Sequence, residues 1–249
     1  MPRTILDVSR WQGSIDWDKV KASGKIDGVM IRAMGNKNGK PYLDPYFARN
    51  YAECARLGIP VGGYYYTCAV TPRQTEEELA ASNSSPGQNV PAAPCHRCGG
   101  PPPALPSPRK AFALVAEAAA QLEAWGLYAM VYTYTNFADT ALDMAALAAY
   151  DLWIADYRGT RPTRKHGMWQ YTSSGTIPGV SGPVDLSVAY KDYAAIISGP
   201  GWGRSGGETD VAMDRPILGR VGFRSAGHRR HRGGHQVQGS AGRRAGHPA

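Results

Sequence analysis

Short apolar runs alternate with amphipathic stretches along most of the chain. Helices are expected at residues 14–20, 44–57, 71–81, 108–125 and 142–149, and Gly58 and Gly126 each follow a helix as a C-cap. Strands are expected at residues 4–8, 28–33, 59–67, 128–132, 152–156, 168–171 and 184–186. Strands that alternate with helices favour a mainly parallel sheet, and about seven of them favour a barrel over an open sheet. The predicted fold class is therefore α/β, a modified TIM-like (β/α) barrel.

Residues 83–107 interrupt this alternation. The stretch 83–106 holds seven of the chain's 19 prolines and no convincing strand, at the position where the barrel requires its fourth strand. A Pro/Gly-rich composition is typical of loops and linkers. We therefore expect a barrel domain over residues 1–198, with an irregular segment over 83–107 replacing a strand, and a separate tail over 199–249.

Composition and charge exclude several classes of protein. With 249 residues and 43% hydrophobic content, the chain can form a sizeable core and is not wholly disordered. The net charge of +8 lies mostly in the tail, which has nine arginines and three acids from residue 204 onward. This Gly/Arg/His-rich tail predicts a disordered cationic segment that binds polyanions such as anionic wall polymers, and no specific nucleic-acid partner.

Two further segment types are not expected. The chain has no run of about 18 apolar residues, so we expect no membrane span. The N-terminus enters a strand-like run at once, without a charged and apolar leader, so we expect no signal peptide and leave the export route open.

Candidate catalytic and binding residues lie near the ends of the predicted strands, where barrel enzymes build their sites. The acids among them are Asp7, Asp156 and Asp185. The other candidates are one amide, Gln170, and the aromatic residues near the same ends: Trp11, Tyr64, Tyr65, Tyr66, Tyr132, Trp169 and Tyr171. Carboxylates among aromatic rings are typical of a sugar-binding cleft, because rings stack on sugar faces while acids bind hydroxyls or protonate the glycosidic oxygen. The alternative is that each acid caps a helix and each ring is part of the core.

Five ordered motifs resemble glycoside hydrolase family 25, the lysozymes of bacteria and their phages. They are DVSRWQGSIDW at 7–17, IPVGGYYY at 59–66, YDLWIADY at 150–157, MWQY at 168–171 and VSGPVDL at 180–186. The resemblance implies an N-acetylmuramidase that cleaves the β-1,4 bond between N-acetylmuramic acid and N-acetylglucosamine in peptidoglycan. It also implies a retaining reaction with the substrate acetamido group as nucleophile, no metal or cofactor, a monomer, and action at the cell wall or outside the cell.

The same resemblance assigns roles to the candidates. Asp7 and Asp185 match the family's acids on the first and last strands and are the predicted catalytic residues, which position the sugar and set the charge of the site. Tyr64, Tyr66, Trp169 and Tyr171 would line the cleft. Asp156 and Gln170 would bind substrate hydroxyls.

The sequence departs from the family on the fourth strand. The family carries an Asp-x-Glu pair there, whose Glu is the general acid, but this chain has no acid between Glu78 and Glu117. Loss of a general acid costs about 10²–10⁴ in rate, so we expect impaired hydrolysis. Read one base later, the codons for residues 96–101 permit Ile-Asp-Val-Glu-Asp. We therefore hypothesise that 83–107 is a translated frameshift, from the gene or from sequencing.

Three other interpretations stay open at this stage. One is a catalytically silent peptidoglycan-binding protein, and another is a non-functional product whose barrel cannot close because a missing strand leaves two unpaired edges. The third is a zinc or redox site at Cys95-x-x-Cys98. A structural zinc requires two further ligands, and only Cys54 and Cys68 remain, far apart on other elements.

Overall fold

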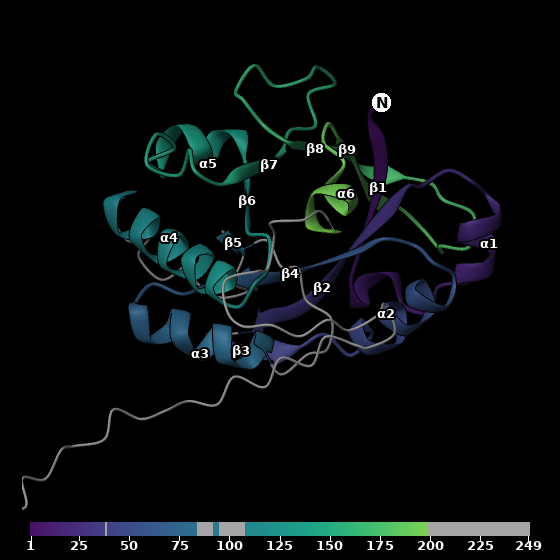
Figure 1. The fold of residues 1–249 in the computed structure, drawn as a ribbon, viewed down its shortest axis with the longest axis horizontal. Helices are drawn as coiled ribbons and strands as arrows, with labels where there is room; N and C mark the ends of the chain where they lie inside the picture. Colours follow the sequence, from purple (N-terminus) through teal and green to yellow (C-terminus); the bar gives the residue numbers. More distant parts are fainter. Residues whose placement is uncertain (38, 84–91, 95–107, 199–249) are drawn as a thin grey trace, which may run out of the picture. The chain divides into compact units, whose positions relative to one another are not determined.

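The computed structural model describes residues 1–37, 39–83, 92–94 and 108–198, and strands and helices alternate along it (Figure 1). Within this part, one sheet contains nine strands: β1 (Arg3–Val8), β2 (Gly28–Lys37), β3 (Lys40–Leu43), β4 (Val61–Thr67), β5 (Ala92–Pro94), β6 (Met130–Tyr134), β7 (Asp151–Ala155), β8 (Met168–Gly175) and β9 (Val184–Ala189). The helices are the 3₁₀ turn η1 (Arg10–Gln12), α1 (Trp17–Ala22), α2 (Phe47–Arg56), α3 (Pro72–Asn83), α4 (Pro108–Ala124), α5 (Thr135–Thr140) and α6 (Tyr193–Ser198). The predicted α/β class is confirmed.

The sheet closes on itself because β1 has a partner on each side. It pairs with β2 in parallel and with β9 in antiparallel orientation. The ring then runs through β9, β8, β7, β6, β5, β4 and β2, while β3 forms a hairpin with β2. β9 is antiparallel to both of its neighbours, so the sheet is mixed.

The segment 83–107 contains a strand, so the expectation of a wholly irregular stretch was wrong. β5 lies beside β4 through three residue pairs and beside β6 through one, Ala92 with Val131. Because one strand spans a gap of about 10 Å between its two neighbours, even three residues connect them. Pro94 ends β5, as expected for a residue without an N–H to extend the ladder. Residues 84–91 and 95–107 lie outside the described residues, as does the tail over 199–249.

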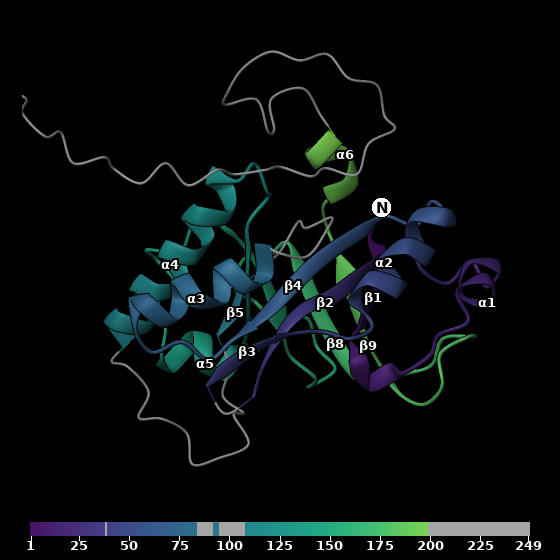
Figure 2. The ribbon, with the colours of Figure 1, turned by 90° about the horizontal axis from the view of Figure 1, so that it is seen from below.

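Apolar side chains fill the ring and cover its outer face. Inside, the core consists of Met30, Met130, Trp153, Met168 and Ala189. Outside, α3 and α4 lie side by side and bury an apolar cluster around Tyr65 of β4 (Figures 1 and 2). Each fully buried large apolar side chain contributes about 1.5–3 kcal/mol. These clusters hold the strand ends, and therefore the site, in fixed positions.

Helix boundaries follow local sequence signals at most positions. Asp16 caps α1, since its carboxylate accepts a hydrogen bond from the Lys19 amide at 3.0 Å. Gly58 and Gly126 adopt φ of 61° and 78° after α2 and α4, which confirms the two predicted C-caps.

One predicted helix was wrong. Residues 142–149 form turns, and the helix in this region is the earlier α5. The Asp143 carboxylate holds the turn through the Ala146 amide at 3.1 Å. Leu142 and Leu147 are both buried there. The two leucines are five positions apart, which is not the spacing of one helix face, and the turn buries both of them.

Candidate functional site

Asp7 and Asp185 lie at the same end of the ring. Asp7 is near the end of β1 and Asp185 is near the start of the antiparallel β9, and the two residues are direct partners in the register of these strands. Side chains of such partners share one face, with Cβ atoms about 4.5–5.5 Å apart. Both line a pocket of about 230 Å³ at the carboxyl ends of the parallel strands. The other lining residues are Ser9, Trp11, Gln12, Arg32, Tyr64, Tyr66, Tyr132 and Trp153.

Burial raises the pKa values of both carboxyls. Burial alone raises the pKa of Asp185 to about 6. The pKa of Asp7 lies well above its ordinary value because of burial and the nearby Asp185 charge, although hydrogen bonds from Tyr64 and Gln170 and the charge of Arg32 oppose the rise. The pair therefore retains protons into a pH range where an exposed aspartate is fully ionised.

Gln170 is the centre of a buried hydrogen-bond network behind Asp7. Its Oε1 accepts hydrogen bonds from the hydroxyls of Tyr132 at 2.7 Å and Tyr157 at 2.6 Å. Its Nε2 donates to Asp7 Oδ2 at 2.8 Å. Because an ionised carboxylate can only accept hydrogen bonds whereas a phenol can donate, the amino group faces Asp7 and the amide oxygen faces the two tyrosines. Gln170 is 1% exposed, so it supports the Asp7 carboxylate from behind.

Arg32 supplies a positive charge to the pocket. It extends from β2, and its Nε donates to Asp44 Oδ2 at 2.8 Å in a buried ion pair. The same Asp44 oxygen accepts the Arg10 amide at 3.0 Å, which joins the loop after β1 to the end of β3. Sequence analysis did not single out Arg32, although an arginine inside the apolar run 28–34 is itself a signal of a buried charge.

Aromatic side chains form the base and rim of the pocket. The indole of Trp153 lies under the rings of Tyr64 and Tyr132, with centroid distances of 6.0 and 4.7 Å and edge-on geometry in both pairs. Tyr157 is 52% exposed although its hydroxyl is bound to Gln170, so much of the residue remains accessible to solvent. Trp153 and Tyr157 were not among the predicted site residues.

Four residues predicted to line the cleft or bind sugar hydroxyls are not among those that line the pocket: Asp156, Trp169, Gln170 and Tyr171. Gln170 lies behind Asp7, to which it donates a hydrogen bond. The Asp156 carboxylate is occupied by hydrogen bonds from Arg158 and Thr135, and these bonds hold its pKa below the ordinary value despite burial. Alternation along β8 places Trp169 and Tyr171 on the opposite face from Gln170. Trp169 donates from its indole to the Asp156 carbonyl at 2.8 Å, and Tyr171 packs against the outer core.

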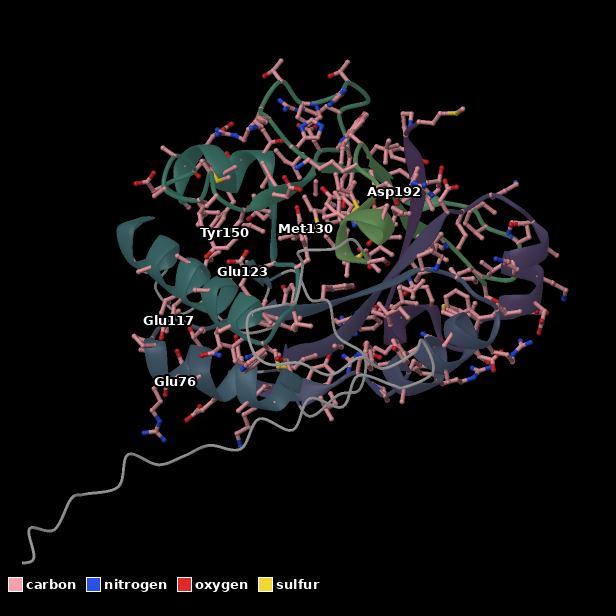
Figure 3. All side chains as sticks on the ribbon, viewed as in Figure 1. Glu76, Glu117, Glu123, Met130, Tyr150 and Asp192 are labelled. Atoms are coloured by element: carbon pink, nitrogen blue, oxygen red, sulfur yellow. The ribbon has the colours of Figure 1, made fainter. Side chains whose placement is uncertain are left out.

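The acids nearest along the chain to the missing pair lie away from the pocket. Glu76, Glu117 and Glu123 are on the helices α3 and α4 (Figure 3) and are exposed. Glu78 is 2% exposed and faces the sheet, where Asn36 and the Cys68 amide donate to its Oε1 at 2.9 and 3.0 Å. Asp7 and Asp185 are thus the only acids lining this pocket in the described part of the chain.

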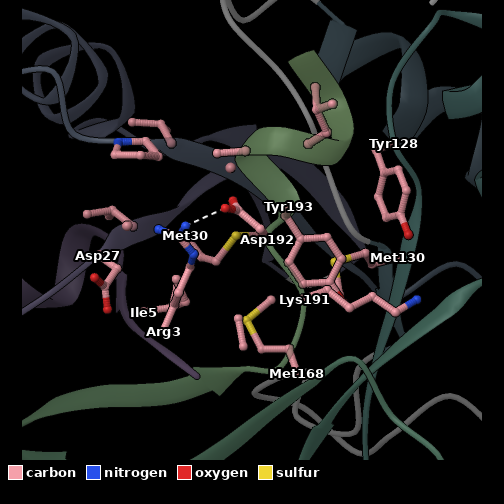
Figure 4. A pocket seen from close by; sticks show the side chains of 18 of the residues that line it. Arg3, Ile5, Asp27, Met30, Tyr128, Met130, Met168, Lys191, Asp192 and Tyr193 are labelled. Atoms are coloured by element: carbon pink, nitrogen blue, oxygen red, sulfur yellow. Dashed lines mark hydrogen bonds and ion pairs between the residues drawn. The ribbon is translucent and has the colours of Figure 1, made fainter. Parts of the chain in front are cut away.

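A second pocket lies at the opposite end of the ring. Met30, Met130 and Met168 approach it from the interior, and an ion pair between Arg3 and Asp192 lies at its edge (Figure 4). Its volume is about 350 Å³. Because active sites of such barrels lie at the carboxyl ends of the strands, this pocket is not the catalytic candidate.

Two searches of the described residues concern metal ligands and membrane-spanning helices. No cluster of three or more His, Cys, Asp or Glu side chains that could hold a metal occurs in 1–37, 39–83, 92–94 and 108–198. Cys54 is buried and Cys68 is disulfide-bonded, while Cys95 and Cys98 lie outside the described residues. In the same ranges, no helix is long and apolar enough to cross a bilayer.

Sequence comparison identifies relatives with named activities. The chain is 28% identical to the autolytic lysozyme of Clostridium acetobutylicum over 219 residues, which cover 86% of this chain and 64% of the relative. It is also 28% identical to lysozyme M1 of Streptomyces globisporus over 206 residues, or 72% of this chain and 65% of that one. The chain thus spans about two thirds of the length of these lysozymes.

Solved structures with the same fold include an autolysin and a lysozyme of bacteria. The modular autolysin LytC of Streptococcus pneumoniae, solved with a synthetic peptidoglycan ligand, superposes with a TM-score of 0.65 at 26% identity, over 76% of this chain and 47% of LytC. A lysozyme from Streptomyces coelicolor superposes with a TM-score of 0.66 at 24% identity, over 78% of this chain and 95% of that lysozyme. The profile of the glycosyl hydrolases family 25 matches residues 6–89 and 106–180. The chain therefore belongs to the glycosyl hydrolases of family 25.

Proposed function

We propose that this chain binds peptidoglycan in the Asp7–Asp185 pocket and that it hydrolyses the β-1,4 muramyl bond only very slowly. The observation that carries the proposal is the pocket itself, in which two family acids lie opposite each other while residues 79–116 contain no carboxylate. The modified TIM-like barrel keeps a sugar-binding cleft but lacks the proton donor of the fourth strand.

The chemistry of the pocket is consistent with binding and positioning. Asp7 and Asp185 can accept hydrogen bonds from sugar hydroxyls when ionised and donate to an acetamido oxygen when protonated. Gln170 and Tyr64 hold the Asp7 carboxylate in place. Cleavage additionally requires a proton on the leaving oxygen, and without that donor the rate falls by about 10²–10⁴. The acetamido group of the substrate would still be present as nucleophile, so a slow residual reaction is expected.

The pattern of the family match supports the frameshift hypothesis. The profile stops at residue 89 and resumes at 106, so the unmatched stretch contains the positions whose shifted codons permit Ile-Asp-Val-Glu-Asp. Resequencing the coding DNA tests this directly. Codons that do not encode the Asp-x-Glu pair in the shifted frame would refute the frameshift hypothesis.

Lysis and binding assays distinguish a slow hydrolase, a catalytically silent wall-binding protein and a non-functional product. The unmodified chain is compared with a chain in which the acidic strand is restored by His96→Ile, Arg97→Asp, Cys98→Val, Gly99→Glu and Gly100→Asp. Co-sedimentation with purified cell-wall sacculi measures binding, and loss of turbidity of a wall suspension measures lysis. We expect both chains to bind and the restored chain to lyse the wall at least about 100-fold faster than the unmodified chain. Lysis at equal rates refutes the proposal, and failure of the soluble unmodified chain to bind refutes the binding function.

The silent binding protein is favoured over a product that cannot fold. β5 continues the ring between β4 and β6, so these strands do not present two unpaired edges at that position. The proposal for this folded chain is accordingly that it binds the wall as a monomer outside the cell. Aggregation of the unmodified chain in the binding assay would support the non-functional product instead.

A further inference from the structure

One aromatic side chain at the rim of the pocket is held out in solvent. Trp11 of η1 is 74% exposed and also lines the pocket beside Asp7 and Asp185. Tryptophan is normally highly buried on average, and exposed aromatic residues next to a cleft are enriched among binding residues. The exposed position of the Trp11 indole therefore indicates a ligand that extends out of the pocket.

The turn that carries Trp11 is fixed at both ends. The Ser9 hydroxyl accepts a hydrogen bond from the Trp11 amide at 3.3 Å, and the Ser9 amide donates to Gln12 Oε1 at 2.9 Å, which completes a capping box. The Arg10 amide donates to the buried Asp44 carboxylate at 3.0 Å. The backbone under the indole is therefore ordered before any ligand arrives.

The indole is supported from one side by a stacked cation. The Arg10 guanidinium carbon lies 4.8 Å from the centre of the Trp11 ring and 4.9 Å from the centre of the Tyr42 ring. Tyr42 in turn covers Gly35 of β2, where an added Cβ would come within 2.5 Å of the Tyr42 hydroxyl. Cation–π contacts of this kind contribute stability and orientation to an exposed ring. Because Arg10 covers one face of the indole, the other face remains for a ligand.

We propose that Trp11, supported by Arg10 and Tyr42, is a platform for an additional sugar of the glycan strand, next to the sugar held in the pocket. This inference rests on the proposed peptidoglycan binding and adds a subsite to it. The apolar face of a pyranose ring matches the flat indole, and the rigid support means that little side-chain entropy is lost on binding. Continuity with the pocket directs the strand from Asp7 and Asp185 across Trp11.

The test compares glycans of different length. N-acetylmuramic acid as a single sugar and a peptide-free peptidoglycan oligosaccharide of six sugars are titrated by calorimetry into the unmodified chain, Trp11→Ala and Trp11→Phe. Truncation of an aromatic anchor is expected to weaken six-sugar binding about tenfold. Binding of the single sugar changes less than about twofold, because one sugar occupies the pocket beside Asp7 and Asp185 and does not reach the platform. Trp11→Phe restores most of the lost affinity, since an aromatic face is present again. Ile196→Ala, which truncates another exposed apolar side chain on α6, serves as the matched control and leaves both affinities unchanged.

Each result has one interpretation. Equal six-sugar affinity for Trp11→Ala and the unmodified chain overturns the platform and leaves the proposed binding function intact. Equal loss for both sugars, with a lowered melting temperature, means that Trp11 is structural and also overturns the platform. Absence of binding of either sugar to the unmodified chain refutes the proposed function, and the platform with it.

Discussion

Replacement of Asp185 by asparagine should stabilise the protein at neutral pH. Burial raises the pKa of Asp185 to about 6 in the folded chain, from an ordinary value of 3.8. The unfolded chain therefore releases this proton more easily than the folded chain between pH 4 and 6. The contribution of Asp185 to the free energy of unfolding is therefore highest below pH 4, where its carboxyl is protonated in both states, and it falls as the pH rises through about 6. Asparagine does not ionise, so Asp185→Asn avoids this loss.

The size of the effect follows from the same pKa. A rise from 3.8 to about 6 corresponds to about 3 kcal/mol, at 1.36 kcal/mol per pKa unit. Because Asp185 is only partly buried, solvent screening reduces the expected gain to about 1–2 kcal/mol. Asp185→Asn should thus be more stable than the unmodified chain at pH 7.5 and equally stable at pH 4.

Urea unfolding at pH 4 and pH 7.5 measures this difference, and Asp151→Asn provides a control of opposite sign. Burial acts to raise the pKa of Asp151, but hydrogen bonds from Lys191 and Tyr128, each at 2.6 Å, hold it below its ordinary value. Asp151→Asn should therefore lose stability at pH 7.5. If Asp185→Asn is destabilising at pH 7.5, or if its effect does not depend on pH, the assigned electrostatics of the pocket are wrong.

Two further substitutions test the network around Asp7. Arg32→Met removes the cationic partner of the buried Asp44 carboxylate. Because a buried charge then lacks its ion pair, the free energy of unfolding, measured with urea at pH 7, should fall by about 3–5 kcal/mol. A fall of less than about 1 kcal/mol would contradict the buried pair. Gln170→Glu replaces the amino group facing Asp7 with an acid. Its loss of stability, about 1–3 kcal/mol at pH 7, should diminish at pH 4 as the added carboxyl is protonated, and a loss independent of pH would contradict the assigned donor.

Local sequence patterns were sufficient to predict most of the ring and its two acids. Asp7 and Asp185 each belong to a short apolar run, and the structure brings them together at one end of the ring: Asp7 lies near the end of β1, and Asp185 lies near the start of the antiparallel β9. The order of residues along β8 also predicts which side chains share a face. Successive side chains of a strand point to opposite faces, so Gln170 faces the opposite side from Trp169 and Tyr171. The predicted cleft grouped all three residues, so this signal was present and was not used.

Long-range partners could not be predicted in this way. Nothing near Arg32 in the sequence indicates that Asp44, on the far side of a hairpin, neutralises it. β5 has the sequence Ala-Ala-Pro, without the β-branched or aromatic residues that favour strands, and it forms because β4 and β6 provide partners on both sides. The helix predicted at 142–149 was wrong: Leu142 and Leu147 are five positions apart and do not share one helix face, although the alanines around them favour a helix.

The most direct test of the account is the number of reducing ends that the unmodified chain releases from purified peptidoglycan, compared with the chain restored at residues 96–100. The account predicts that the unmodified chain binds the polymer but releases reducing ends at least about 100-fold more slowly than the restored chain. Release by the unmodified chain within about tenfold of the restored chain would show that another group donates the proton, and would contradict the central claim.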